Sequence, residues 1–197
     1  GQGGTTTIIY DPKRRQVVRQ FLSLAGTIIN CAGGPTPWRS WISCEETQMQ
    51  AGEDWKKDHG YNFEVPVTEK LGLAEPLPLK SMGRFSHEAV AIDPRTSIAY
   101  QTEDEGNGLI YRFIPNVPGK LHKGGELQAL RFTSTPSMDT RNWKESTVLK
   151  KELYDIGWIT LQDTDSPEND LRFRGRESGA AIFARGESIY YNNGKIF

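Results

Sequence analysis

The feature that most constrains the fold of this chain is a hydrophobic pattern of period two that recurs along almost its whole length. Short runs in which β-branched and aromatic residues alternate with polar ones are typical of half-buried strands. Turn sequences such as Asp11-Pro12 and Asn193-Gly194 separate these runs. We therefore predict an all-β chain with strands over residues 5–10, 27–30, 40–44, 61–65, 88–92, 98–102, 109–114, 127–132, 158–161, 180–184 and 188–191.

A weak internal repeat predicts how these strands are arranged. The segment Trp41-Ile42-Ser43-Cys44-Glu45-Glu46 superimposes on Ala99-Tyr100-Gln101-Thr102-Glu103-Asp104, and a strand led by Gly follows each one. Antiparallel sheets repeated radially around a channel produce such a pattern. We predict a β-propeller with three to four blades in this chain. Helical periodicity is restricted to residues 142–154 and 55–58, which we interpret as insertions.

Composition limits the classes of partner. The formal net charge of −1 comes without a basic stripe, which argues against nucleic acid and against an anionic membrane surface. No apolar run reaches the length of a membrane span. The chain starts at Gly1 without an initiator Met and stops at Phe197 within an apolar run. We therefore expect residues 1–197 to be one partial domain, incomplete at the C-terminus and also at the N-terminus.

Acidic residues gather at predicted strand ends and suggest a metal site. Glu88 and Glu187 adjoin apolar strands, where a carboxylate must be paired or bound to a cation. Carboxylates that converge on an axis repel one another, and hard cations such as calcium or iron(III) relieve this repulsion. His59, His87 and His122 match no zinc-hydrolase spacing, and we interpret His87 as a core or supporting histidine.

The two cysteines, Cys31 and Cys44, allow three interpretations: an oxidised pair, two buried thiols, or one metal ligand with a bystander. Cys31 precedes a Gly-Gly-Pro turn, and a thiolate there would favour a transition metal over calcium alone. Strand alternation directs Cys44 away from Glu45, so we interpret Cys44 as a packing residue.

Arg185 is the residue that we expect to recognise an anion. It lies in the acidic cluster Ala184-Arg185-Gly186-Glu187, and a planar guanidinium grips a phosphate through two parallel hydrogen bonds. The alternative is a salt bridge to a neighbouring carboxylate. The chain has no Gly-x-Ser-x-Gly, P-loop or Gly-x-Gly-x-x-Gly motif, so a serine hydrolase and a nucleotide-binding enzyme are not supported.

Several motifs, in order along the chain, resemble those of the PhoX-type alkaline phosphatases. They are Gly3-Gly4-Thr5-Thr6-Thr7, Asn30-Cys31-Ala32-Gly33-Gly34-Pro35-Thr36-Pro37-Trp38, Cys44-Glu45-Glu46-Thr47, Met82-Gly83-Arg84-Phe85-Ser86-His87-Glu88-Ala89, Asp93-Pro94-Arg95-Thr96, Tyr111-Arg112-Phe113 and Phe183-Ala184-Arg185-Gly186-Glu187.

This resemblance implies a six-bladed propeller that hydrolyses phosphate monoesters and is exported through the twin-arginine route to the periplasm or cell surface. It implies iron(III) and calcium as cofactors, a metal-bound oxygen as the nucleophile and Arg185 as the phosphate-binding residue. Small phosphomonoesters are the expected partners of a monomer. The metal ligands that it implies are Cys31, Glu46, Glu88, Glu103, Asp104 and Glu187, with Glu46 favoured over Glu45 and with Glu103 and Asp104 not distinguished.

Two other functions remain open on the sequence. One is a calcium-bound propeller without catalytic activity that serves as a binding scaffold. The other is a calcium-dependent propeller similar to the lactonases. Phosphatase activity that depends on Cys31 and Arg185 separates the leading hypothesis from both.

Overall fold

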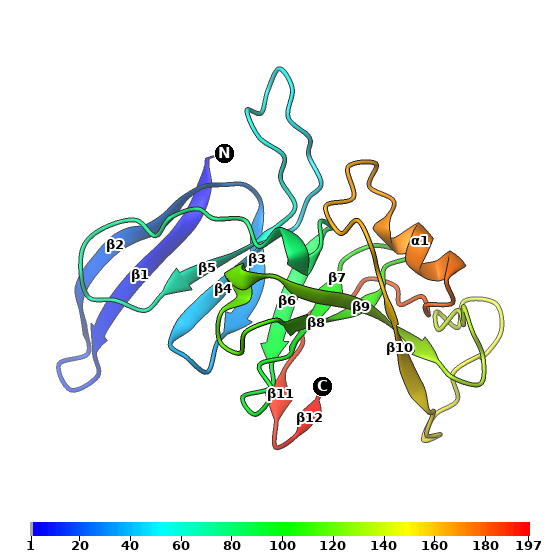
Figure 1. The fold of residues 1–197 in the computed structure, drawn as a ribbon. Coiled ribbons are helices and arrows are strands. Elements are labelled where there is room, and N and C mark those ends of the chain that lie inside the picture. Colours follow the sequence, from blue (N-terminus) through cyan, green and yellow to red (C-terminus); the bar gives the residue numbers. More distant parts are fainter. Residues whose placement is uncertain (1) are drawn as a thin grey trace.

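The computed structural model describes residues 2–197, and its secondary structure is almost entirely β (Figure 1). The strands form one sheet of eight strands and two hairpins. Their bounds are β1 Gly3–Asp11, β2 Gln16–Thr27, β3 Asn30–Pro35, β4 Ser40–Glu45, β5 Asn62–Pro66, β6 His87–Ile92, β7 Ala99–Glu103, β8 Ile110–Pro115, β9 Gly125–Phe132, β10 Ile156–Thr160, β11 Tyr191–Asn192 and β12 Lys195–Ile196. The all-β prediction is confirmed.

The eight-stranded sheet consists of two antiparallel meanders that meet at their first strands. Its order is β10-β9-β8-β7-β6-β3-β4-β5, so β3 and β6 lie side by side at the centre. These two strands are parallel and pair at Gly33 and Ala89. The blue β1–β2 hairpin lies at one end of the molecule and α1 (Leu171–Glu177) at the other (Figure 1). The six-bladed propeller stays a prediction.

Two adjacent glycines allow β3 to approach both of its neighbours. A Cβ atom on Gly33 would lie 1.9 Å from the carbonyl oxygen of Ile42 in β4, and one on Gly34 would lie 1.9 Å from that of Val90 in β6. Gly33 also has a φ of +65°, which glycine adopts without steric cost. The sequence predicted a turn after Cys31. The chain instead continues as a strand with a bulge between Cys31 and Gly34.

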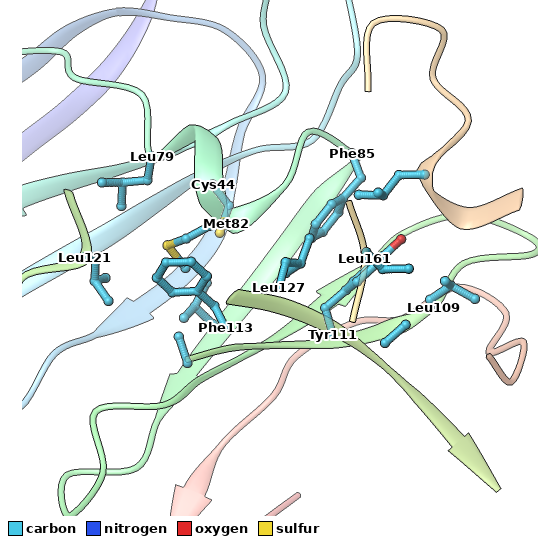
Figure 2. Packing of buried hydrophobic residues seen from close by; sticks show 14 of the residues in the cluster. Cys44, Leu79, Met82, Phe85, Leu109, Tyr111, Phe113, Leu121, Leu127 and Leu161 are labelled. Carbon is cyan, nitrogen blue, oxygen red and sulfur yellow. The ribbon is translucent and has the colours of Figure 1, made fainter. Parts of the chain in front are cut away.

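The main hydrophobic core packs beside the meander formed by β6 to β10 (Figure 2). Phe85 stacks on Tyr111 with ring centroids 4.3 Å apart, and Phe113 and Leu127 are almost completely buried with it. Cys44 is also buried in this core, as expected for a packing residue, and both cysteines are free thiols. The core therefore anchors the segment that leads into β6.

The helical predictions were wrong. Residues 142–154 and 55–58 contain no helix, and Asn142 and Lys151 adopt positive φ angles of 53° and 69° that interrupt any helix. The observed elements are α1 and two short 3-10 turns, η1 (Lys80–Met82) and η2 (Leu121–Lys123). No helix among residues 2–197 is long and apolar enough to cross a membrane.

Three predicted strands also differ from the structure. Residues 180–184 form only isolated bridges, from Ile182 to Asp139 and from Phe183 to Gly108. Of residues 188–191, only Tyr191 belongs to a strand, and residues 27–30 span the junction between β2 and β3. For residues 180–184 the bridge partners Asp139 and Gly108 lie outside the named strands, so no ladder forms there.

Candidate metal centre

Three side chains from separate elements converge where β3, β4 and β6 meet. Cys31 lies in β3, Glu46 directly follows β4, and Glu88 lies in β6. One donor atom from each lies within 4.8 Å of the other two. The Cys31 thiol donates a hydrogen bond to Glu88 Oε1 at 3.0 Å. One sulfur and two carboxylates thus form a compact donor set, although Cys31 and Glu88 are 57 residues apart in the chain.

Backbone hydrogen bonds fix this convergence. The N–H of Glu46 donates to the carbonyl of Ile29 at 2.9 Å, two residues before Cys31. Glu46 also forms an isolated bridge with Ser86, whose carbonyl accepts the N–H of Asp104 at 3.1 Å. The end of β4 is therefore tied to the starts of β3 and β6 and to the end of β7.

The electrostatics of this cluster are set by burial and by the neighbouring acids. Burial and the hydrogen bond to Glu88 raise the pKa of Cys31 to about 12. Burial and a hydrogen bond with Asp104 raise the pKa of Glu46. A bound cation would reverse both shifts, since it stabilises the thiolate and the carboxylates. A mixed sulfur and oxygen donor set suits a transition metal with hard character.

Asp104 extends the cluster toward Arg185. Asp104 Oδ1 is buried and accepts no hydrogen bond from residues 2–197, although Arg185 Nε lies 3.0 Å away and pairs with it ionically. The Arg185 side chain is 66% exposed. Its backbone φ of 56° is held because its N–H donates to Glu105 O and that of Gly186 donates to Glu103 O. The sequence kept a salt bridge to a neighbouring carboxylate as the alternative for Arg185, and Asp104 is the carboxylate that pairs with it.

Two further predicted ligands, Glu103 and Glu187, lie outside both this donor set and its extension at Asp104. Glu103 is completely buried, and its Oε2 accepts hydrogen bonds from the N–H of Leu109 and the hydroxyl of Tyr111, each at 2.9 Å. Burial raises the pKa of Glu103 to about 7. The Glu187 side chain is exposed, while its carbonyl accepts a hydrogen bond from Thr102 at 2.6 Å. Ligation by Glu103 and Glu187 stays a prediction.

His87 is a core residue, as the sequence predicted. It is almost completely buried, it stacks on Phe85 at 3.6 Å, and its Nε2 lies 3.0 Å from the carbonyl oxygen of Gly83. Burial lowers its pKa to about 3, so the ring is neutral at physiological pH. His87 is therefore an uncharged packing residue of the core.

Comparison with known proteins gives two matches. A family model described as alkaline phosphatase PhoX matches residues 2–197. Among solved structures, the chain is similar to Pseudomonas fluorescens PhoX in complex with vanadate, a transition state analogue, at 18% identity and a TM-score of 0.57. The match covers 98% of this chain and 44% of that one, so it supports a shared fold over less than half of the solved protein. No curated protein sequence matches this chain.

Proposed function

Because this chain belongs to the PhoX alkaline phosphatase family, we propose that its protein is a metal-dependent hydrolase of phosphate monoesters. The single observation that carries the proposal is the convergence of Cys31, Glu46 and Glu88, whose donor atoms lie within 4.8 Å of one another. Four anionic or thiol groups, Asp104 included, crowd a site in which Arg185 is the adjacent cation. A cation would stabilise this arrangement.

In this proposal Cys31, Glu46 and Glu88 hold the metal ions, and Asp104 lies between them and Arg185. Iron(III) and calcium agree with the donor set, because the thiolate favours a transition metal and the carboxylates suit hard cations. When bound, the ions supply Lewis-acid stabilisation of the negative charge that develops on the phosphoryl group. Glu103 and Glu187 would join the set only if binding moves their carboxylates.

Arg185 binds the phosphoryl oxygens. Asp104 pairs with its Nε, and the Arg185 side chain is 66% exposed. The outer edge of the guanidinium is therefore available to a substrate, and its planar fork matches two phosphoryl oxygens. A charge held at this point before reaction stabilises the transition state more than the ground state.

The wider setting follows from the family. The substrates are small phosphomonoesters, and the compartment is the periplasm or the cell surface. The parallel contact of β3 with β6 has the geometry expected where the inner strands of two propeller blades meet. We therefore propose that the two meanders are neighbouring blades of a propeller whose channel contains the metal centre.

The test is p-nitrophenyl phosphate hydrolysis at alkaline pH by protein loaded with iron and calcium. Cys31→Ala and Arg185→Ala should each lower kcat/KM by about 100-fold or more. Cys44→Ala is the matched thiol control. Arg95→Ala is the matched arginine control, since Arg95 is 69% exposed and pairs with the mostly buried Asp93. Activity that survives both substitutions, or chelation, would contradict the proposal. Calcium binding without turnover would favour the scaffold.

A further inference from the structure

Glu45, the neighbour of Glu46, is a buried carboxylate with an unusually complete set of donors. Its exposed fraction is 0%. Oε1 and Oε2 each accept two hydrogen bonds, at 2.7 to 3.2 Å. The donors are the backbone N–H groups of Ile28, Gly60 and Tyr61 and the Nδ1 of His59. One side chain therefore joins the β2–β3 junction to the start of β5.

The residue next to one of these donors has a strained backbone. Ile29 has a φ of 43°, a conformation that is rare for a β-branched residue. Its side chain is 51% exposed, so packing of that side chain does not account for the conformation. Such strain persists only where surrounding contacts impose it. Here the contacts are the bond from Ile28 N to Glu45 Oε1 and the bond from Glu46 N to Ile29 O.

These two bonds connect the strained turn to the donor set. Ile29 is two residues before Cys31, so its conformation sets the direction in which the chain enters β3. Its carbonyl accepts the N–H of Glu46. We propose that Glu45 is a positioning residue that holds residues 28–29 in the left-handed turn and thereby places Cys31 and Glu46 against Glu88. The inference rests on the proposed metal centre.

A buried arginine binds the backbone of His59 and of the residues that follow Glu46. Arg84 is 1% exposed, and its Nε donates to the carbonyl of His59 at 2.8 Å. Its Nη2 donates to the carbonyls of Gln48 and Met49, just after Glu46. Arg84 thus holds the backbone of His59, whose side chain donates to Glu45. Outer partners of this kind orient metal ligands without touching the ion.

The first experiment measures Co(II) binding to metal-stripped protein through the thiolate-to-cobalt charge-transfer band. Glu45→Gln presents an amide N–H₂ group where an oxygen now accepts, and should weaken Co(II) binding about 10- to 100-fold. Glu64→Gln is the matched control. Glu64 Oε1 also accepts two hydrogen bonds, from Trp38 and Ser40, but at the opposite end of β4. This control should leave Co(II) binding unchanged.

The second experiment is a rescue that a general structural role would not allow. Glycine adopts a positive φ without cost, whereas alanine does not. Ile29→Gly in the Glu45→Gln background should therefore restore most of the lost Co(II) affinity and the original charge-transfer band. Ile29→Ala removes nearly the same side chain and should restore neither. A glycine also makes the unfolded chain more flexible, so rescue through overall stability is not expected.

The outcomes separate this inference from the proposed function. Glu45→Gln that binds Co(II) as tightly as Glu64→Gln, or rescue by Ile29→Ala equal to that by Ile29→Gly, would overturn the positioning role. Cys31→Ala should abolish the charge-transfer band. A band that survives Cys31→Ala would instead overturn the metal centre on which the inference rests.

Discussion

Two acidic pairs, Glu45-Glu46 at the end of β4 and Glu103-Asp104 at the end of β7, are arranged in the same way. In each pair the first acid, Glu45 or Glu103, is the last residue of its strand and is completely buried among hydrogen-bond donors. The second acid, Glu46 or Asp104, belongs to the anionic cluster. Because successive side chains point to opposite sides of a strand, alternation separates a structural acid from a candidate ligand.

The two pairs differ in how fully the first acid is satisfied. Glu45 accepts four hydrogen bonds, whereas Glu103 accepts two, and its Oε1 has no hydrogen-bond partner within residues 2–197. The nearest cation to that oxygen is Arg172 Nη1, at 3.9 Å. Burial raises the pKa of Glu103 to about 7. The comparison therefore predicts that substitution of Glu45 and of Glu103 will change stability in different ways.

The largest effect is expected for Glu45→Ala. Removing this carboxylate leaves its buried donors without an acceptor, so the free energy of unfolding should fall by about 3–5 kcal/mol. Urea denaturation of the metal-free protein measures it. Glu64→Ala releases only two donors, on the half-buried Trp38 and the buried Ser40, and should cost less than about 2 kcal/mol. Equal losses in the two variants would mean that Glu45 has no special structural role.

Glu103 should make the stability of the metal-free protein depend on pH. Burial raises its pKa from 4.5 to about 7, so between these values the folded state binds a proton that the unfolded state has lost. The free energy of unfolding should therefore fall as the pH rises from about 4.5 to about 7, by at most about 3 kcal/mol. A glutamine at position 103 does not ionise, so the Glu103→Gln variant should lack this fall in the free energy of unfolding. Parallel stability curves for the metal-free wild type and variant would refute it.

Substitution of Glu46, the second acid of β4, should weaken metal binding and catalysis with little change in stability. Glu46→Gln should lower metal affinity and phosphatase kcat/KM by about 100-fold, which corresponds to about 2.7 kcal/mol. The metal-free variant should unfold within about 0.5 kcal/mol of the wild type, because the lost carboxylate is partly exposed and faces other anions. Isothermal titration, p-nitrophenyl phosphate kinetics and urea denaturation measure metal affinity, kcat/KM and stability, respectively. A large loss of stability in the metal-free variant would mean that Glu46, like Glu45, mainly stabilises the fold.

The sequence predicted much of this comparison. The repeat that aligns Glu45 with Glu103 also aligns Glu46 with Asp104, and the structure gives each aligned residue the same disposition. The strong β-formers of β4 to β9 gave correct strands because alternation and propensity agree there. The preference for Glu46 over Glu45 stays a prediction, although the structure places only Glu46 beside Cys31 and Glu88.

Other features depend on contacts that no local pattern encodes. β3 is a strand because Gly33 and Gly34 admit the backbones of β4 and β6, and this close approach is invisible in the sequence. The short helix α1 begins where Ser166 Oγ accepts the N–H groups of Asp170 and Leu171, within a highly charged segment. The strained turn at Ile29 likewise depends on Glu45, which lies 16 residues away along the chain.

The smallest effect is expected at Asp104, and it decides which task the second acid of β7 performs. Asp104 Oδ1 lies 3.0 Å from Arg185 Nε, so Asp104→Asn removes the charge that orients the guanidinium. If this is its main task, the inhibition constant for inorganic phosphate should rise about 10-fold, equivalent to about 1.4 kcal/mol, while Co(II) affinity stays unchanged. Arg185→Ala should cancel the effect in the double variant, because the two residues then act as one unit. Loss of Co(II) affinity in Asp104→Asn, with phosphate inhibition unchanged, would instead make Asp104 a ligand equivalent to Glu46.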